Sequence, residues 1–418
     1  MSGRSESVVV VGAGIIGLAC GHYLRDAGYE VTLVDRESAG GACSHGNMGL
    51  VCPSHILPLT EPSTLQRGLK SLLRPRSAFR IRPQLRVELY EWLWQFARRC
   101  RYPQMIEAGT HLRAILDSSI AEYRRLVAEH PKLAEEWRDE GLLYVFEREQ
   151  GLDAFAETDE IVSREFGVSA RRLDGSALSA MEPALREGLA GAYYYPEDAS
   201  IRPDTLCGAW SAHLRSSGVQ VLENREITGI RKTGHRIDAL ITESESISAD
   251  HYVFAAGAWS RGIGRLLGKK LPVEPGKGYS MTLTVAHGLT NRPLLLPERH
   301  VGITPFRGGL RIGSMMEFVG YDRTIPELRI RQLSAAATAV LRTEPEGQEE
   351  ERWYGWRPMT WDSLPIIGRL QELDNAIVAT GHNMIGLALA PATGKLVAEI
   401  IAERPTHIPA DAFNPGRF

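Results

Sequence analysis

The sequence predicts a mixed α/β (α+β) protein, in which a Rossmann-like nucleotide-binding domain is interleaved with a second domain built on a mostly antiparallel sheet. Three observations support this prediction. An apolar strand at Val8–Val11 leads into a glycine turn and a helix. Two further buried strands, at 252–254 and 376–380, lie far along the chain. Residues 273–319 have the pattern of successive strands separated by Gly and Pro turns.

The length of 418 residues favours two to three domains, because single cores rarely grow beyond about 250–300 residues. We expect the nucleotide-binding domain to be assembled from separated segments, over residues 1–62, 196–268 and 345–418. The substrate-binding domain would take residues 63–195 and 269–344, with a basic helical insertion at about 63–103.

Each element follows from local pattern. The first strand is followed by a helix over 18–27 that ends at Gly28, a strand over 29–34 and a Gly-, Ser- and Pro-rich loop over 38–60. Residues 63–130 are predicted helical, with breaks at Pro75, Pro83 and Pro103. The remaining predicted strands are 142–146, 193–195, 219–222, 227–231, 237–242, 252–254 and 376–380, and the remaining helices are 205–216, 327–342 and 386 to about 403.

Composition excludes several classes of protein. A net charge of −3 argues against a dedicated nucleic-acid binder, and the average composition argues against a disordered or disulfide-stapled chain. Five cysteines without a CxxC pair predict free thiols in a reducing, cytoplasmic compartment, and no metal site. The N-terminal segment lacks the pattern of a signal peptide, and no run of about 18 apolar residues predicts a membrane span.

The first turn carries the clearest chemical signal. Gly12-x-Gly14-x-x-Gly17 stands between a strand and a helix, where the glycines permit a tight turn, close approach of a pyrophosphate, and close helix packing. Asp35 follows the second strand, where a carboxylate can accept from ribose hydroxyls. Arg36 next to it leaves open which dinucleotide is bound. A glycine turn without a ligand is the alternative.

These motifs continue along the chain in a recognisable order. VVVVGAGIIGL (8–18), SHGNMGLV (44–51), ELYEWLWQFARRC (88–100), GVQV (218–221), FAAGAWS (254–260), GKGYSMTL (276–283), RIGSMMEFVGYD (311–322) and WRPMTWDSLPIIGR (356–369) together resemble the D-amino-acid oxidase/dehydrogenase superfamily of FAD enzymes. The chain most resembles the bacterial D-amino-acid dehydrogenases, while its 381–394 turn is more similar to the flavin loop of glycine oxidases.

The resemblance implies a set of FAD-binding residues. In the first turn and after the second strand these are Gly12, Ala13, Gly14, Ile15, Ile16, Gly17, Asp35 and Arg36. In the early flavin loop they are Ser44, His45, Gly46, Asn47, Met48, Gly49 and Leu50. Later in the chain they are Ile227, Ala256, Gly257, Trp259, Met384, Ile385, Gly386 and Leu387. A helix beginning in the last of these turns could stabilise negative charge on the flavin.

Arg357 is the candidate for holding the substrate carboxylate, because the family's arginine stands in the matching Trp-Arg-Pro-Met context. A guanidinium binds a carboxylate bidentately and so orients the Cα–H bond; a solvated surface arginine is the alternative. Tyr279 is a second candidate, for the carboxylate or the amine, against a packed strand tyrosine. No general base is nominated, because an amine that arrives neutral can lose hydride directly; His45, His55 and His382 are the titratable groups near the flavin loops.

The resemblance implies FAD-dependent dehydrogenation of a small D-amino acid, such as D-proline or a hydroxy-D-proline, to the imino acid by hydride transfer to flavin N5. Electrons would pass to a quinone or another carrier. FAD is expected to be non-covalent, because no cysteine follows Cys207 and His45 stands one residue away from the family's attachment position. The alternatives are a glycine- or sarcosine-type oxidase that uses O2, and a non-catalytic FAD-binding subunit of a larger complex.

Residues 66–101 carry a local charge of +8, interleaved with aromatic and aliphatic side chains. This composition suits peripheral contact with an anionic membrane surface, at the inner face of the cell membrane. An ordinary helical insertion with a solvated basic face fits the same pattern equally well.

Overall fold

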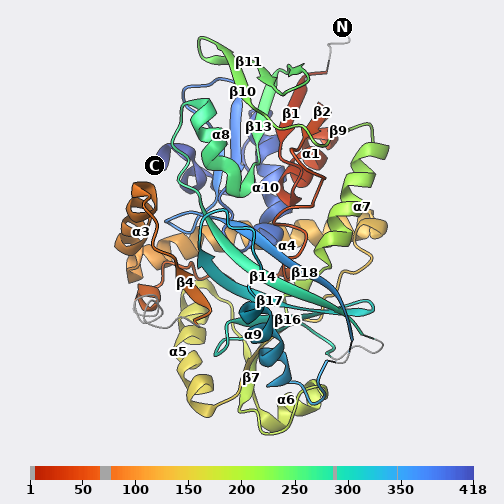
Figure 1. Ribbon diagram of the computed structural model, residues 1–418, viewed down its shortest axis with the longest axis vertical. Coiled ribbons are helices and arrows are strands. Elements are labelled where there is room, and N and C mark those ends of the chain that lie inside the picture. Colours follow the sequence, from red (N-terminus) through yellow and green to blue (C-terminus); the bar gives the residue numbers. More distant parts are fainter. Residues whose placement is uncertain (1–4, 66–76, 286–289, 346) are drawn as a thin grey trace.

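The computed structural model describes residues 5–65, 77–285, 290–345 and 347–418, and two large sheets dominate it (Figure 1). The first sheet occupies the upper half of the view and the second the lower half. The first has six strands, all parallel except for its edge strand β19. Its order is β19 (Ile366–Arg369), β20 (Ala376–Thr380), β13 (His251–Phe254), β1 (Ser7–Val11), β2 (Glu30–Val34) and β9 (Gln220–Leu222).

Both faces of this sheet are covered, which is why its central strand is apolar throughout. Val8 and Val10 belong to a core cluster shared with helices on one face, whereas Val9 and Val11 belong to the core on the other. The first face carries α1 (Ile15–Asp26), α4 (Tyr102–Glu129), α7 (Pro203–Ser216) and α10 (Gly386–Ile401). The second carries α8 (Ser260–Leu267) and a small sheet of β10 (Gly229–Thr233), β11 (Arg236–Ile241) and β12 (Ser246–Ile247).

The second sheet has nine strands and is mostly antiparallel, with parallel pairs only at β5–β15 and β4–β17. Its path is β18 (Gln348–Met359), β14 (Glu274–Thr284), β17 (Gly309–Phe318), β16 (Val301–Phe306), β15 (Leu294–Leu296), β5 (Leu142–Phe146), β7 (Gly191–Tyr195) and β6 (Arg171–Asp174), with β4 (Phe79–Ile81) beside β17. Helix α9 (Glu327–Thr338) packs against one face, where Ile330 and Leu333 meet Met281 and Leu283. The opposite face of β5 and β7 packs against α5 (Glu149–Phe166), where Phe146 and Tyr193 belong to one core cluster with Leu152.

The remaining elements lie around this sheet and at the junction. They are α3 (Val87–Arg99), α5 (Glu149–Phe166), α6 (Gly175–Met181), the two-stranded pair β3 (Leu50–Val51) and β8 (Ala199–Ser200), and 3-10 turns at Pro131–Leu133, Gly257–Trp259, Asp411–Phe413 and Pro415–Arg417. No described helix has the length and apolarity needed to cross a membrane. All five cysteines are unpaired thiols.

The expected mixed fold, with a mostly antiparallel second sheet, is confirmed, but two segments lie elsewhere than expected. Strand β18 belongs to the nine-stranded sheet, so the return to the nucleotide-binding sheet comes near Met359 and not at residue 345. Helix α4, expected in the substrate-binding domain, packs on α10 in the core of the first sheet. Both errors have one cause: sequence gives the order of elements but not which sheet each one joins.

Local expectations were wrong in other places as well. Strand β4 lies within residues 63–130, which were predicted helical, and α8 was not predicted. The helix at 149–166 was not predicted, because its polar residues outnumber the apolar ones that mark a helix face. The helix at 175–181 was not predicted, because seven residues are too few to show a helical period. The expected break at Pro103 is confirmed, because α3 ends at Arg99 and α4 begins at Tyr102 with Pro103 in its first turn, where the missing N–H costs nothing. Pro75 lies outside the described residues.

Candidate functional site

One large cavity, of about 1000 Å³, lies between the two sheets and receives residues from both. Its walls come from the turn after β1, the end of β2, the 42–55 loop, the turn after β13, strands β14 and β18, and the turn before α10. Most of the sequence-predicted cofactor residues line this cavity. The exceptions are Ala13, Gly17, His45 and Gly49, which lie behind its wall.

The first turn is shaped by contacts that only glycine permits. Gly12 has φ of +103°, and a Cβ there would stand 2.4 Å from the Ala255 carbonyl oxygen. A Cβ on Gly17 would stand 1.7 Å from the Gly12 oxygen, so this residue serves packing and not ligand contact. Gly14, by contrast, is open on the cavity side and precedes the first turn of α1. The free N–H groups of a helix N-terminus suit a pyrophosphate there.

Asp35 braces the same turn. Its carboxylate accepts hydrogen bonds from the backbone N–H groups of Ala13 at 2.6 Å and Glu37 at 2.9 Å. Burial raises the pKa of Asp35, and these two hydrogen bonds oppose that rise. The residue lines the cavity, so its remaining lone pairs are available to ribose hydroxyls.

The adenosine end of the predicted site is formed by Arg36, Ile227 and Trp259, which all line the cavity. The Arg36 guanidinium lies 4.2 Å from the centre of the Trp259 ring, a cation–π contact that closes this end. Ala256 and Gly257 follow β13 and border the same space. Sequence reasoning missed Thr228, Arg261 and Ile263, which also line it.

The loop of residues 44–50 lies against the cavity-facing side of the nine-stranded sheet. Ser44 caps α1, because its hydroxyl oxygen accepts from the Ile15 N–H at 3.0 Å. Ser44, Gly46, Asn47, Met48 and Leu50 line the cavity. Two residues of this loop were expected to do so but do not. The His45 imidazole is 2.9 Å from Glu351 on the other side of the loop, and Gly49, at φ +72°, faces the Ile201 carbonyl.

The turn before α10 completes the wall opposite this loop, with Met384, Ile385, Gly386 and Leu387 on the cavity. Asn383, at φ +51°, accepts from the Thr360 N–H at 2.9 Å and so holds the turn to the end of β18. His382 is buried and contacts Thr393 at 3.0 Å. Burial lowers the pKa of His382 to about 3, so it is a neutral, structural residue.

Arg357 projects from β18 into the substrate side of the cavity. Its Nη1 donates to the Met315 carbonyl at 2.7 Å, and the guanidinium lies on Gly278, where a Cβ would stand 2.3 Å from Nη1. Burial lowers the pKa of Arg357, although a guanidinium stays charged. No carboxylate in the described parts of the chain pairs with it.

The other arginines around the cavity differ in this respect. Arg36, Arg86, Arg225 and Arg261 each pair with a glutamate, and Arg265 is exposed. Arg357 therefore combines partial burial with a guanidinium still able to take an anion. This is the arrangement expected of a carboxylate-binding group.

Tyr279 lies in the part of β14 that borders the cavity, but its hydroxyl points to the opposite face of the sheet. The hydroxyl donates to Glu317, which also accepts from Arg329 at 2.6 Å, on the face of the sheet covered by α9. The structure therefore does not bring the Tyr279 hydroxyl to Arg357. Alternation along β14 explains this, because Gly278 lies against Arg357 and Ser280 donates to the Gly46 carbonyl on one face, whereas Tyr279 points to the other.

Sequence reasoning missed Trp353 and Cys52 on the substrate side. It also missed Tyr321, which lines the cavity and stacks on Trp259 with ring centres 6.4 Å apart. Recognising β18 would have revealed Trp353, because it shares alternation with Gly355 and Arg357. His55, which sequence reasoning had named, lines this side as well, with its Nδ1 3.5 Å from the Tyr144 hydroxyl. Burial lowers the pKa of His55 to about 4, so it adds no charge to the pocket at neutral pH.

Sequence comparisons match the chain to known proteins over nearly its whole length. A model of the DAO family, described as FAD dependent oxidoreductase, matches residues 7–400. A D-amino acid dehydrogenase of Neisseria meningitidis serogroup C is 32% identical over 98% of this chain and 99% of its own length. One from Vibrio vulnificus is 29% identical over 96% of this chain and 97% of its own.

Solved structures with the same fold include glycine oxidase from Geobacillus kaustophilus, with a TM-score of 0.78, 23% identity, and coverage of 99% of this chain and 100% of that one. L-proline dehydrogenase from P. horikoshii has a TM-score of 0.74 and 23% identity over 99% of this chain and 98% of that one. At such identities these structures establish a shared fold.

Proposed function

The chain belongs to the DAO family of FAD-dependent oxidoreductases, and we propose that within this family it dehydrogenates a small D-amino acid to the imino acid. When bound, FAD accepts a hydride from the amino-acid Cα. The Gly12–Ile16 turn and Asp35 would hold its pyrophosphate and ribose, and the 44–50 loop and the 384–387 turn would hold its ring system. The shape of the glycine turn, which a single Cβ would block, fits this cofactor.

The observation that carries the proposal is Arg357. Its unpaired, half-buried guanidinium faces the cavity between the flavin loop and β18, where it can hold a carboxylate in two hydrogen bonds and orient the Cα–H bond. Because Tyr279 donates to Glu317 on the other face, we assign the carboxylate to Arg357. The D configuration is supported by the names of the 32%-identical relatives.

The substrate side favours an amino acid with a neutral side chain. Neutral His55 and the apolar Met48, Leu50 and Leu295 provide no second charge there. D-proline and hydroxy-D-proline meet this condition, since their carboxylate is their single negative group. FAD would be non-covalent: His45 is engaged by Glu351, and burial raises the pKa of Cys43 to about 11, so that its thiol is a poor nucleophile.

A panel of D- and L-amino acids tests this proposal. The purified yellow protein should bleach anaerobically with one or more neutral D-amino acids, and an artificial dye or quinone should restore its colour faster than air does. Rapid peroxide formation in air would favour the oxidase alternative. Persistent colour across the whole panel would favour a non-catalytic FAD-binding subunit.

We further propose a cytoplasmic protein whose basic segment touches the inner face of the membrane, where a quinone or another carrier takes the electrons. Helix α3, at the left edge of Figure 1, supports this. Val87, Tyr90 and Trp94 recur at helical spacing on its surface and are 81%, 52% and 55% exposed, and Leu85 precedes them fully exposed. Residues 66–76 of the basic segment lie outside the described residues.

Co-sedimentation with vesicles tests the membrane contact. Binding to vesicles containing phosphatidylglycerol should exceed binding to phosphatidylcholine vesicles and should weaken with salt. Trp94→Ser should reduce vesicle binding severalfold. Arg352→Ser, on strand β18 and away from α3, is the control and should bind like wild type. Equal binding by Trp94→Ser and wild type would rule out this surface.

A further inference from the structure

The loop of residues 44–49 is held by the protein through every one of its carbonyl groups. Asn47 Nδ2 donates to the Ser44 oxygen at 2.6 Å, and the Ile201 N–H donates to the Gly49 oxygen at 2.8 Å. The four carbonyls between them accept from side chains of β14, β16 and β17. The loop is thus attached to the second sheet by its carbonyl side.

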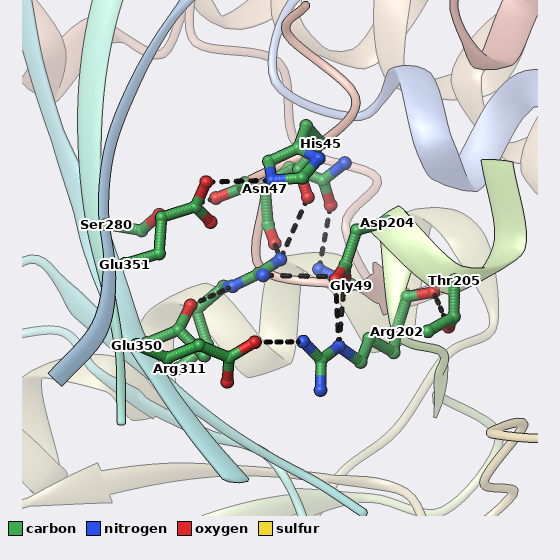
Figure 2. Close-up of polar contacts among 12 residues, drawn as sticks. His45, Asn47, Gly49, Arg202, Asp204, Thr205, Ser280, Arg311, Glu350 and Glu351 are labelled. Atoms are coloured by element: carbon green, nitrogen blue, oxygen red, sulfur yellow. Dashed lines mark hydrogen bonds and ion pairs between the residues drawn. The ribbon is translucent and has the colours of Figure 1, made fainter. Parts of the chain in front are cut away.

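Arg311 is the centre of this attachment (Figure 2). Its Nη1 donates to the carbonyls of His45 and Asn47, both at 3.0 Å, and its Nε donates to Thr282 at 3.0 Å. Ser280 donates to the Gly46 carbonyl at 2.7 Å. Thr304 donates to the Met48 carbonyl at 2.7 Å. Thr282, Arg311 and Thr304 are paired directly across β14, β17 and β16, so the donors form one row.

The buried charge of Arg311 is balanced by Asp204, an acid from the first domain. The Arg311 side chain is 1% exposed, and Asp204 of α7 lies 3.4 Å from Nη2. Arg202 donates to the same carboxylate at 3.0 Å and to Glu350 at 2.9 Å. Figure 2 shows Arg311, Asp204, Arg202 and Glu350 joined in one series of contacts below His45 and Asn47. The contacts of Arg311 with the loop carbonyls and with Asp204, which we call the clamp, therefore join both domains.

The loop side chains fit the same sheet surface. A Cβ on Gly313 would stand 2.7 Å from the Met48 sulfur, and a Cβ on Gly46 would stand 2.2 Å from the Trp353 ring. Glycine at both positions lets the loop lie directly on the strands. Without the clamp, the loop would no longer be held close enough to the strands to keep the contacts of Met48 with Gly313 and of Gly46 with Trp353.

This attachment decides which way the peptide groups face. In a planar trans peptide the C=O and the N–H point in opposite directions. Carbonyls directed to the sheet therefore direct the N–H groups of Gly46, Asn47 and Met48 away from it, and these three residues line the cavity. Among the described residues, none accepts a hydrogen bond from these N–H groups.

We propose that Arg311 is a positioning residue, which turns the loop so that three consecutive backbone N–H groups face the ring system of the bound flavin. Successive N–H groups of this kind form an anion-favouring concavity. Arg311 itself touches no cofactor or substrate and acts through the loop. The inference rests on the proposed position of the flavin beside the loop, but not on the proposed substrate.

FAD binding and the properties of bound FAD test the role of Arg311. Arg311→Met keeps an apolar stem of similar length and removes the donors to the His45 and Asn47 carbonyls. We expect the dissociation constant for FAD to rise at least about tenfold, since hydrogen bonds from charged groups contribute that much or more. The absorption bands of the bound flavin should shift toward those of free FAD, and its reduction potential should fall. Arg311→Lys should recover part of each change.

Arg329→Met is the matched control. Arg329 is an equally buried arginine on the α9 side of the same sheet, paired with Glu317 and remote from the loop. It should lower the melting temperature without changing the flavin spectrum or potential. The same spectral changes in Arg329→Met would overturn the proposal, because they would follow from the loss of any buried guanidinium.

Two other results also refute the role of Arg311. One is an Arg311→Met protein whose bound flavin keeps the wild-type spectrum and potential, whatever its affinity. The other concerns Ser280→Ala and Thr304→Val, which each remove one further donor to a loop carbonyl. These two variants test the attachment of the loop if Arg311→Met fails to fold. Unchanged FAD affinity and spectrum in both would show that the attachment does not matter. Failure of the proposed function is seen separately, as wild-type protein that no amino acid reduces.

Discussion

Replacing Arg357 by methionine should separate substrate binding from cofactor binding. The variant keeps an unbranched side chain over Gly278 and removes the guanidinium that faces the cavity. FAD contacts the opposite walls in our proposal, so the flavin content of the purified variant should equal that of wild type. Turnover of the amino acid that reduces the wild-type enzyme should collapse.

The structure sets the size of this effect. One Nη1 hydrogen of Arg357 is used by the Met315 carbonyl, and the rest of the fork is available to a carboxylate. Two hydrogen bonds from a charged donor contribute about 3–6 kcal/mol, so kcat/KM should fall by roughly 10²- to 10⁴-fold. Arg357→Lys keeps the charge but loses the fork, and should fall by about 10- to 100-fold.

Gly278→Ala tests the same geometry without removing the charge. Its Cβ would stand 2.3 Å from Nη1 and 2.6 Å from Cζ of Arg357, so the guanidinium must move. We expect kcat/KM to fall about tenfold or more while FAD stays bound, since displacement of a positioning group by about 1 Å costs on the order of 10²-fold in rate.

Steady-state rates with a dye acceptor, measured without oxygen, give kcat and KM for each variant, and visible absorbance gives FAD content. Arg352→Met is the control, because this arginine is exposed on the same strand and pairs with Glu327 and Glu349. It should change kcat/KM by less than about twofold. If Arg357→Met also stays within about threefold of wild type, Arg357 does not hold the substrate carboxylate.

Three further predictions follow from the same contacts. Gly12→Ala should abolish FAD binding, seen as loss of the visible flavin absorbance, because its Cβ would stand 2.4 Å from the Ala255 oxygen at a φ of +103°; a yellow variant would contradict the role of the turn. Glu351 raises the pKa of His45, so the stabilisation by this pair is complete below the unfolded value of about 6.5 and is lost as pH rises through the higher folded value. His45→Gln should therefore lower the melting temperature by about 1 °C more at pH 6 than at pH 9, and an equal effect at both would exclude the pair as the cause. Burial raises the pKa of Asp198 to about 7, so its protonated form is favoured in the folded state and stability is lost as pH rises through that value. The loss begins near the unfolded value of about 3.9 and is complete above pH 7. Asp198→Asn keeps an acceptor for the Ser54 N–H and should raise the melting temperature by roughly 2 °C more at pH 8 than at pH 4, whereas a drop at pH 8 would show that the carboxylate is needed charged.

Local sequence was sufficient to predict those parts of the site and fold that lie within a short continuous segment of the chain. The Gly12–Gly17 turn and Asp35 could be predicted because a strand, a turn and a helix contact one another in sequence order, and the structure brings Asp35 onto the Ala13 N–H. The strand at Ala376–Thr380 was predicted at its observed bounds, because a fully buried strand is apolar throughout. These features need no knowledge of the rest of the molecule.

The direction of side chains across the second sheet could not be predicted in the same way. Tyr279 and Gly278 are neighbours in sequence, yet one faces α9 and the other faces Arg357, and this depends on which strands flank β14. His45 was expected on the flavin, but Glu351, more than 300 residues away, holds it on the other side of the loop. Pairing between distant strands sets such choices, and one residue of register reverses them.

The sequence by itself determined the family of the chain, its mixed fold, and the identity of the glycine turn, because these depend on residue types in a fixed local order. The tertiary structure decided which groups face the cavity. It left Arg357 as a partly buried arginine on the cavity with no described carboxylate partner, turned Tyr279 away, and placed Arg311, an arginine that no local pattern marks, against the carbonyls of the 44–49 loop. The physical reason is that the state of a charged or polar group depends on what surrounds it in space, and those surroundings come from strands distant in sequence.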